Sequence, residues 1–180
     1  MARNAIFLGA GLLSLAVSSA SVGEEPSAGR LSSGGVYVGI ATGGYFPIQK
    51  WPSSYTLGGG GNLIVGYQFD LHWSLQLDTT MWLLSGDGRD TWDLKVIPQV
   101  RLDIGTSVVR PFVLTGFGFN YQLDQPGSSS TIRPVLTAGL GLGYEFRTGC
   151  RLFIEVLGYL VFGPVTTKDL PVVAGLVVNF

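Results

Sequence analysis

The sequence predicts an all-β fold, an eight-stranded antiparallel up-and-down barrel, and three observations predict it. First, the 180-residue chain ends in an alternating stretch, in which Val172, Ala174, Leu176, Val178 and Phe180 share one face of a strand. This strand needs a partner on each side, because an unpaired edge exposes backbone donors and acceptors. Second, seven upstream segments alternate in the same way. Third, the connections between these segments alternate in length.

Each of the eight predicted strands alternates large apolar residues with glycine or polar residues. They lie at residues 35–46, 59–70, 71–83, 91–104, 109–122, 132–146, 150–162 and 170–180. The short connections are residues 70–71, 105–107 and 147–149, and the longer, more polar ones are 47–58, 84–90, 123–131 and 163–169. Short turns at one end and long loops at the other are typical of barrels that cross a membrane.

The beginning of the chain indicates export. Arg3 precedes an apolar run over residues 5–17, and small residues follow at 18–20, the pattern of a cleaved secretory signal. The apolar run is shorter than the roughly 20 residues that a membrane-spanning helix needs. We therefore expect a signal peptide at residues 1–20, a flexible N-terminal segment at 21–33 and the barrel at 34–180.

The composition agrees with a barrel in a membrane and excludes some partners. Charged residues make up 13% of the chain and the mean hydropathy is +0.37, whereas soluble domains carry roughly 25% charged residues. The net charge of −1 gives no reason to expect nucleic acid as a partner. Cys150 is the single cysteine, so the chain has no disulfide framework.

One face of each predicted strand is apolar and suits lipid, and the other carries polar groups that suit a lumen. In the strand at 91–104, for example, Trp92 and Leu94 lie opposite Asp93 and Lys95. We expect an ion-pair network in the lumen, formed by Asp78, Asp93, Lys95, Arg101, Asp103, Glu145, Arg151 and Glu155, with Arg110 and Arg133 as further cations. An eight-stranded barrel is only wide enough for side chains to fill it, so the sequence predicts a polar, filled interior. Buried charges need partners, so removing one partner is expected to cost more than removing both.

Glycines and aromatic residues support the same orientation. The glycines of two neighbouring strands fall on the inner face and leave room for long side chains: Gly116, Gly118, Gly139, Gly141 and Gly143. Aromatic residues gather near strand ends, as membrane-interface belts do. The expected belts are Tyr67, Phe69, Trp73, Tyr144, Phe146 and Phe180 at the short-turn end, and Tyr45, Phe46, Trp92, Tyr121 and Phe162 at the long-loop end. Trp82 and Tyr159 fall on the inner face, where a β-bulge or simple filling of the lumen would explain them.

These features together resemble the small eight-stranded outer-membrane β-barrels of Gram-negative bacteria, the OmpA/OmpX-type and related porin-like domains, over residues 34–180. The resemblance implies location in the outer membrane after export, with outer-membrane lipid and lipopolysaccharide as partners. It also implies recognition of the last strand by the barrel-assembly machinery, through Leu176, Val178 and Phe180. An extracellular ligand at the long loops is a further partner in keeping with the family. The expected role is structural support, surface contact or limited permeation, without catalysis.

The sequence contains few residues that could form a catalytic site. With one histidine and one cysteine, an ordinary zinc site is not expected, and neither is any cofactor. His72 and Ser74 share one strand face and resemble the His-x-Ser of outer-membrane lipid A deacylases, so a lipid A-modifying hydrolase is an alternative. Asp87 and Asp90 supply too few oxygen ligands for a calcium site.

Two alternatives come from other classes of protein. A narrow channel for small or apolar solutes has the same strand pattern as a filled barrel, because lumen width depends on how side chains pack. A soluble lipocalin-like binding barrel has apolar residues inside and charges outside. The low content of charged residues argues against the lipocalin-like barrel.

Overall fold

The computed structural model describes residues 34–48, 55–86, 89–123, 131–164 and 166–180. The predicted signal peptide and N-terminal segment lie outside the described residues. The described residues contain no helix that could span a membrane.

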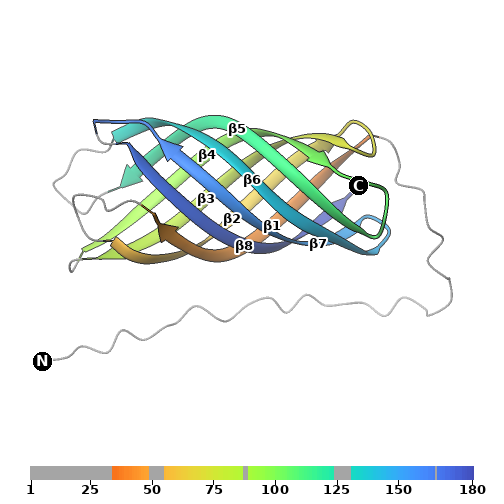
Figure 1. Ribbon diagram of the computed structural model, residues 1–180, viewed down its shortest axis with the longest axis horizontal. Coiled ribbons are helices and arrows are strands. Elements are labelled where there is room, and N and C mark those ends of the chain that lie inside the picture. Colours follow the sequence, from red (N-terminus) through yellow and green to blue (C-terminus); the bar gives the residue numbers. More distant parts are fainter. Residues whose placement is uncertain (1–33, 49–54, 87–88, 124–130, 165) are drawn as a thin grey trace, which may run out of the picture.

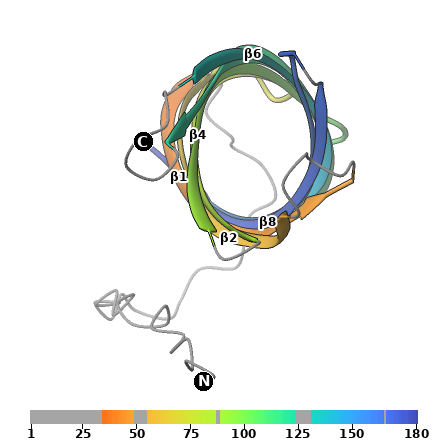
Figure 2. The same cartoon turned by 90° about the vertical axis from the view of Figure 1, so that its left-hand side faces the viewer.

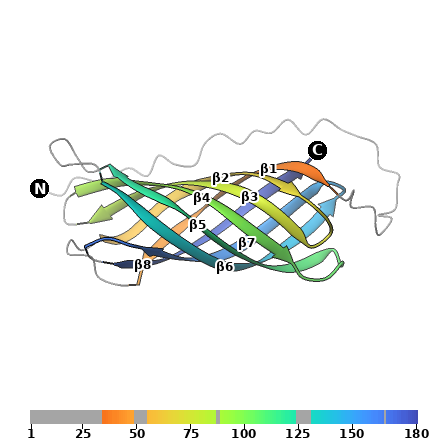
Figure 3. The ribbon, with the colours of Figure 1, turned by 90° about the horizontal axis from the view of Figure 1, so that it is seen from above.

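The described residues form eight antiparallel strands in one closed barrel, with each strand paired to the next in chain order. Their bounds are β1 Gly35–Pro47, β2 Tyr55–Gln68, β3 Trp73–Gly86, β4 Arg89–Asp103, β5 Val109–Leu123, β6 Thr131–Arg147, β7 Cys150–Val161 and β8 Thr167–Asn179. The strands are tilted against the barrel axis, as closure of a sheet requires (Figures 1 and 3). The predicted fold class is therefore confirmed.

Pairing between the first and last strands closes the barrel (Figure 2). The β1–β8 ladder runs from Tyr37 opposite Asn179 to Pro47 opposite Asp169. One further bond extends it, in which the backbone N–H of Phe180 donates to the carbonyl oxygen of Val36 at 2.9 Å. Closure thus gives the outermost strands of the sequence a partner on both sides, and the sheet has no exposed edge.

The strands are longer at the loop end than the sequence analysis predicts. The expected loop at 84–90 is wrong at both sides, because Ser85 pairs with Asp90 and Gly86 with Arg89. Likewise β2 begins at Tyr55 and β8 at Thr167, within the expected loops. Polar residues do not end an antiparallel ladder, since their side chains leave the backbone bonds intact. At the opposite end, β3 begins at Trp73, two residues later than expected.

The outer wall of the barrel is apolar and the interior is mostly polar. Large apolar side chains such as Leu63, Leu77 and Leu140 are 45–63% exposed on the outside. Charged side chains such as Lys95 and Asp103 are at most 2% exposed inside. A soluble lipocalin-like barrel requires the reverse arrangement, so that alternative is wrong. An apolar wall around a polar interior suits a barrel surrounded by hydrocarbon.

The aromatic belts form with one exception. At the short-turn end, exposed rings include Tyr67, Trp73 and Tyr144, and at the loop end they include Phe46 and Trp92. Tyr45, assigned to the loop-end belt, instead points inward and is 1% exposed. The neighbours Tyr45 and Phe46 necessarily face opposite sides of the strand, because successive side chains alternate.

The apolar wall leads to a first prediction. Leu142 on β6 is 51% exposed and faces outward, two residues from Tyr144 of the short-turn belt. We expect Leu142→Arg to lower the free energy of unfolding by about 1–2 kcal/mol, because it moves a charge into the hydrocarbon layer between the midplane and the interface. Urea unfolding in lipid vesicles measures this change.

Thr148→Arg, in the exposed turn between β6 and β7, is the matched control and should leave the unfolding midpoint unchanged. A Leu142→Arg barrel as stable as the wild type would mean that the outer wall does not contact lipid.

Candidate functional site in the barrel lumen

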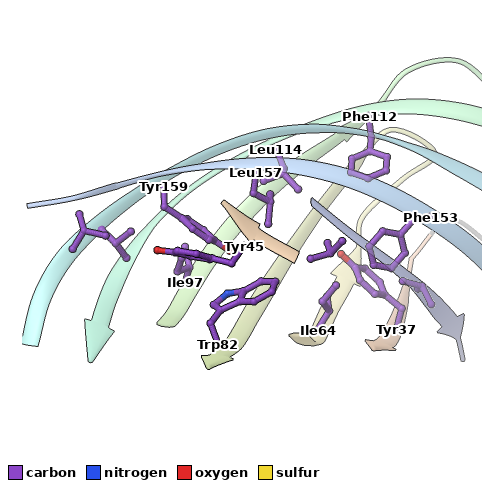
Figure 4. Packing of buried hydrophobic residues seen from close by; sticks show 14 of the residues in the cluster. Tyr37, Tyr45, Ile64, Trp82, Ile97, Phe112, Leu114, Phe153, Leu157 and Tyr159 are labelled. Carbon is purple, nitrogen blue, oxygen red and sulfur yellow. The ribbon is translucent and has the colours of Figure 1, made fainter. Parts of the chain in front are cut away.

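The side chains that point into the barrel form three groups along its axis. A loop-end cluster combines a buried ion pair with aromatic rings, a central chain consists of hydrogen-bonded polar groups, and a short-turn cluster consists of arginines and carboxylates. Figure 4 shows that the apolar members of the lumen divide in a similar way. Tyr45, Trp82 and Tyr159 lie together, apart from Tyr37 and Phe153.

The loop-end cluster is built around Lys95 on β4. Its Nζ lies 2.5 Å from Asp93 Oδ2, and both side chains are at most 2% exposed. The ammonium group also lies 5.2 Å from the ring centre of Tyr45 and 4.9 Å from that of Tyr159. Asn120 of β5 donates a side-chain hydrogen bond to Asp93. The charge is thus balanced by one carboxylate and two aromatic faces, which compensates in part for its removal from water.

Trp82 completes this cluster. Its ring centre lies 5.5 Å from that of Tyr45, and the side chain has no exposed surface. For Trp82 and Tyr159 the sequence left two explanations open, a β-bulge or simple filling of the lumen. Both side chains fill the lumen. The β2–β3 and β6–β7 ladders shift register elsewhere, at Tyr55/Leu57 and Glu145/Arg147, so no bulge is needed to place them.

A chain of hydrogen bonds crosses the middle of the lumen. Tyr37 donates to Gln76 at 2.9 Å, and Gln76 donates to Gln99 at 2.7 Å. Asp78 Oδ2 then accepts from Gln99 at 3.3 Å and from Asn62 at 3.2 Å. The chain links four neighbouring strands, β1 to β4, through their inner faces, so each member restricts the rotamer of the next.

The short-turn cluster holds three arginines and two carboxylates. Asp103 Oδ1 accepts from Arg101 at 2.7 Å and from Arg151 at 3.0 Å, so one carboxylate holds guanidinium groups from β4 and β7. Arg110 of β5 contacts Glu145 of β6 at 3.0 Å. The guanidinium carbon of Arg101 lies 3.6 Å from the ring centre of Phe112.

Of the eight residues in the expected ion-pair network, two form no ion pair with a described residue. Asp78 accepts hydrogen bonds from amide groups only, and Glu155 Oε1 has no hydrogen-bond partner among the described residues. Asp93 and Lys95 pair at the loop end, whereas Arg101, Asp103 and Arg151 meet at the short-turn end, and Glu145 pairs with Arg110. The ion pairs among the described residues therefore form separate groups at the two ends of the lumen. The tilt of the strands sets the height of each side chain, which parity along one strand does not reveal.

Inner-face glycines make room for the long side chains. A Cβ atom built on Gly143 would lie 2.7 Å from Cδ of Arg151 and 3.7 Å from a guanidinium nitrogen of Arg101. A side chain at position 143 would therefore displace the short-turn cluster. This agrees with the predicted role of the glycines on β6.

The lumen is filled across all three groups. The largest inward side chains include Trp82 and Lys95, with no exposed surface, and Gln99, with 1%. Arg151, near the mouth at the short-turn end, is 6% exposed. The inward side chains of the described residues therefore leave little surface accessible to water.

His72 and Ser74 do not form the dyad that the hydrolase alternative requires. His72 lies before β3 and is exposed, and its Nδ1 is 3.1 Å from the backbone oxygen of Asp103. Ser74 is 3% exposed, and its Oγ lies 3.3 Å from the hydroxyl oxygen of Tyr37. The expectation that both side chains share one strand face is thus wrong, because the strand begins between them.

Asp70 is the residue that organises this turn. Its Oδ1 accepts hydrogen bonds from the backbone N–H groups of Trp73 at 2.8 Å and His72 at 2.7 Å. These bonds favour the ionised carboxyl and lower the pKa of Asp70 below its ordinary value. The histidine therefore belongs to a structured turn and not to a pocket.

The described residues contain no group of three or more side chains that could hold a metal ion. Asp87 lies outside the described residues, so the expectation that Asp87 and Asp90 form no calcium site stays a prediction. The proposed assembly signal lies on the outside of β8, where Phe180 is 80% exposed.

Comparison with solved structures finds the same architecture. Neisserial surface protein A aligns with a TM-score of 0.66 at 18% identity, covering 83% of this chain and 98% of that chain. The fold is that of a small outer-membrane β-barrel. The N-terminal barrel domain of Pseudomonas aeruginosa OprF gives a TM-score of 0.57 at 17% identity, covering 82% and 99%. Ail, the attachment invasion locus protein of Yersinia pestis, gives 0.53 at 16% identity, covering 82% and 97%. Neither the protein-family models nor the curated proteins include a match.

Several residues that build this site are not among those predicted from the sequence. Tyr37 starts the central hydrogen-bond chain, Asn120 contacts Asp93, and Phe112 packs on Arg101. Alternation on β1 and β5 places all three on the inner face, so that signal was present. Their partners lie on other strands and depend on the register around the barrel.

The loop-end ion pair leads to a second prediction. We expect Lys95→Met to lower the free energy of unfolding by about 3–5 kcal/mol, because the Asp93 carboxylate would stay buried without its cation. The double variant Asp93→Asn/Lys95→Met removes both charges and should be more stable than the single variant. Urea unfolding of all three proteins in vesicles measures the difference. A double variant less stable than Lys95→Met would contradict a buried, mutually compensating pair.

Proposed function

We propose that this protein is an integral outer-membrane barrel that supports the envelope and makes surface contacts, with a lumen closed by its own side chains. The observation that carries the proposal is the buried interior. Lys95, Trp82 and Asp103 are at most 2% exposed although they lie where a pore would run. A barrel without an open path acts through its wall and its loop end.

The location follows from the combination of fold and surface. The wall is apolar all round, aromatic rings flank it at both ends, and the architecture is shared with Neisserial surface protein A, whose name describes a surface protein. The predicted signal peptide would direct the chain into the secretory pathway. The long-loop end is then extracellular, because the short turns of such barrels are periplasmic.

Surface contact fits the position of the loops better than permeation does. One structural relative, Ail, carries attachment in its name. In this chain two of the four loop-end connections, residues 48–54 and 124–130, are seven residues long, whereas the connections at the short-turn end have two to five residues. A ligand on the outside therefore meets the loops and not a channel mouth.

A lipid-modifying hydrolase is not supported, because Ser74 is buried and His72 contacts a backbone carbonyl. We propose that the protein has no catalytic activity. Lipid A from cells that express the wild type and Ser74→Ala should show the same acylation, and deacylation lost in the variant would overturn this proposal.

The experiment that tests the proposed function combines fractionation with planar-bilayer recording. The wild type should fractionate with the outer membrane, migrate differently on a gel after boiling, and give no stepwise conductance. The variant Trp82→Ala/Tyr159→Ala removes two large rings from the loop-end cluster, so we expect it to give small conductance steps. Stepwise conductance of the wild type would favour the narrow-channel alternative. A wild type that stays folded and monomeric in buffer without detergent would overturn membrane insertion.

A further inference from the structure

The outer wall has a hollow that the proposed function does not use. It lies on the neighbouring strands β6, β7 and β8 near the loop end and has a volume of about 280 Å³. Its outward-facing lining is Ile48, Leu136, Ala138, Gly158, Leu160 and Lys168. All of these except Lys168 are apolar or small.

The floor of this groove is made by two small residues. Ala138 of β6 and Gly158 of β7 are directly paired, and both positions lie on the outer face of the barrel. The apolar side chains of Leu136 and Leu160, which are also paired, rise beside them toward the loop end. A groove with a small-residue floor and aliphatic walls accepts a narrow apolar chain.

A break in the neighbouring ladder accompanies the groove. Pairing between β7 and β8 stops after Val156 opposite Val172 and resumes at Tyr159 opposite Asp169. Pro171 lies in the interval and has no backbone N–H to donate. The ladder between β7 and β8 is therefore interrupted beside Gly158.

The mouth of the groove carries a positive charge. Lys168 is exposed, lies second in β8 at the loop end, and forms no ion pair with a described residue. Its backbone carbonyl accepts from Ile48 at 3.0 Å, which fixes the residue beside the groove. Among the described side chains, it is the cation that faces outward at this end of the barrel. An apolar groove with a cation at the membrane surface is complementary to an acyl chain joined to an anionic headgroup.

We propose that this groove binds one acyl chain of a phosphorylated lipid of the outer leaflet, of the lipid A class, with a headgroup phosphate at Lys168. The inference rests on the proposed orientation, in which the loop end faces outward. It adds a defined lipid site to a barrel that otherwise contacts lipid only through a uniform apolar wall.

The test is binding of lipid A to the detergent-solubilised, full-length mature barrel, measured as an apparent Kd by native mass spectrometry. Gly158→Leu fills the groove from outside, and a Cβ there meets only the backbone oxygen of Ala138 at an ordinary 3.5 Å. We expect this variant to weaken binding about tenfold or more, because each displaced methylene is worth a factor of about four. Lys168→Gln should weaken binding about fivefold.

Two matched variants control for composition. Gly59→Leu adds the same side chain to an outward-facing glycine of β2, where a Cβ has nothing nearer than 4.0 Å. Arg147→Gln removes an exposed cation at the short-turn end. Both should bind lipid A as the wild type does. Dephosphorylated lipid A and phosphatidylethanolamine should bind the wild type weakly and lose the dependence on Lys168.

Several results would overturn the lipid site. One is unchanged binding by Gly158→Leu, and another is equal binding of phosphatidylethanolamine and lipid A. Loss of binding by Gly59→Leu as large as that by Gly158→Leu would mean a general effect of leucine on the wall. Heat-modifiability on a gel is recorded for every variant. Folded variants with unchanged lipid binding would refute this site and leave the proposed function intact, whereas a wild type that never enters membranes would refute the proposed function.

Discussion

Closure of the sheet through the β1–β8 ladder is the constraint on which the rest of the structure depends. In hydrocarbon no water replaces a missing backbone partner, so a sheet with an open edge would leave a row of unsatisfied donors and acceptors. The ladder from Tyr37 opposite Asn179 to Pro47 opposite Asp169 removes that edge. Once the ring is closed, each strand has only an inside and an outside, and the side chains are sorted between the two.

The closed ring in turn decides how the interior is stabilised. Because the outer apolar wall faces lipid, the strands are held together from inside by charges, amides and rings from different strands, beside a cluster of buried apolar side chains. Asp103 holds arginines from β4 and β7, the central chain links β1 to β4, and Lys95 lies between rings from β1 and β7. The Asp103–Arg151 pair and the contacts of Lys95 with Tyr45 and Tyr159 join β4 to strands that are not its neighbours, so these groups also tie distant parts of the wall together.

The outer wall and the interior differ in how many types of side chain each position can accept. Outside, any aliphatic side chain of similar size satisfies the lipid, and positions such as Leu140 and Leu142 are interchangeable in kind. Inside, each charge needs a particular partner at a particular height, since an unpaired buried ion is costly. The groove at Gly158 and Lys168 is an exception on the outer wall, because a small-residue floor lies there beside a positive charge.

The sequence by itself determined the number of strands, their order, and which face of each strand turns inward. These depend on the period-two alternation, which is local and can be read along one strand. The tertiary structure decided which inward residues meet. Lys95 and Arg101 lie on one face of β4, yet they belong to clusters at opposite ends of the lumen, and Tyr45 contacts a lysine instead of lipid. The physical reason is the tilt and stagger of the strands, which set the height of every side chain around the ring and have no counterpart in the pattern of a single strand.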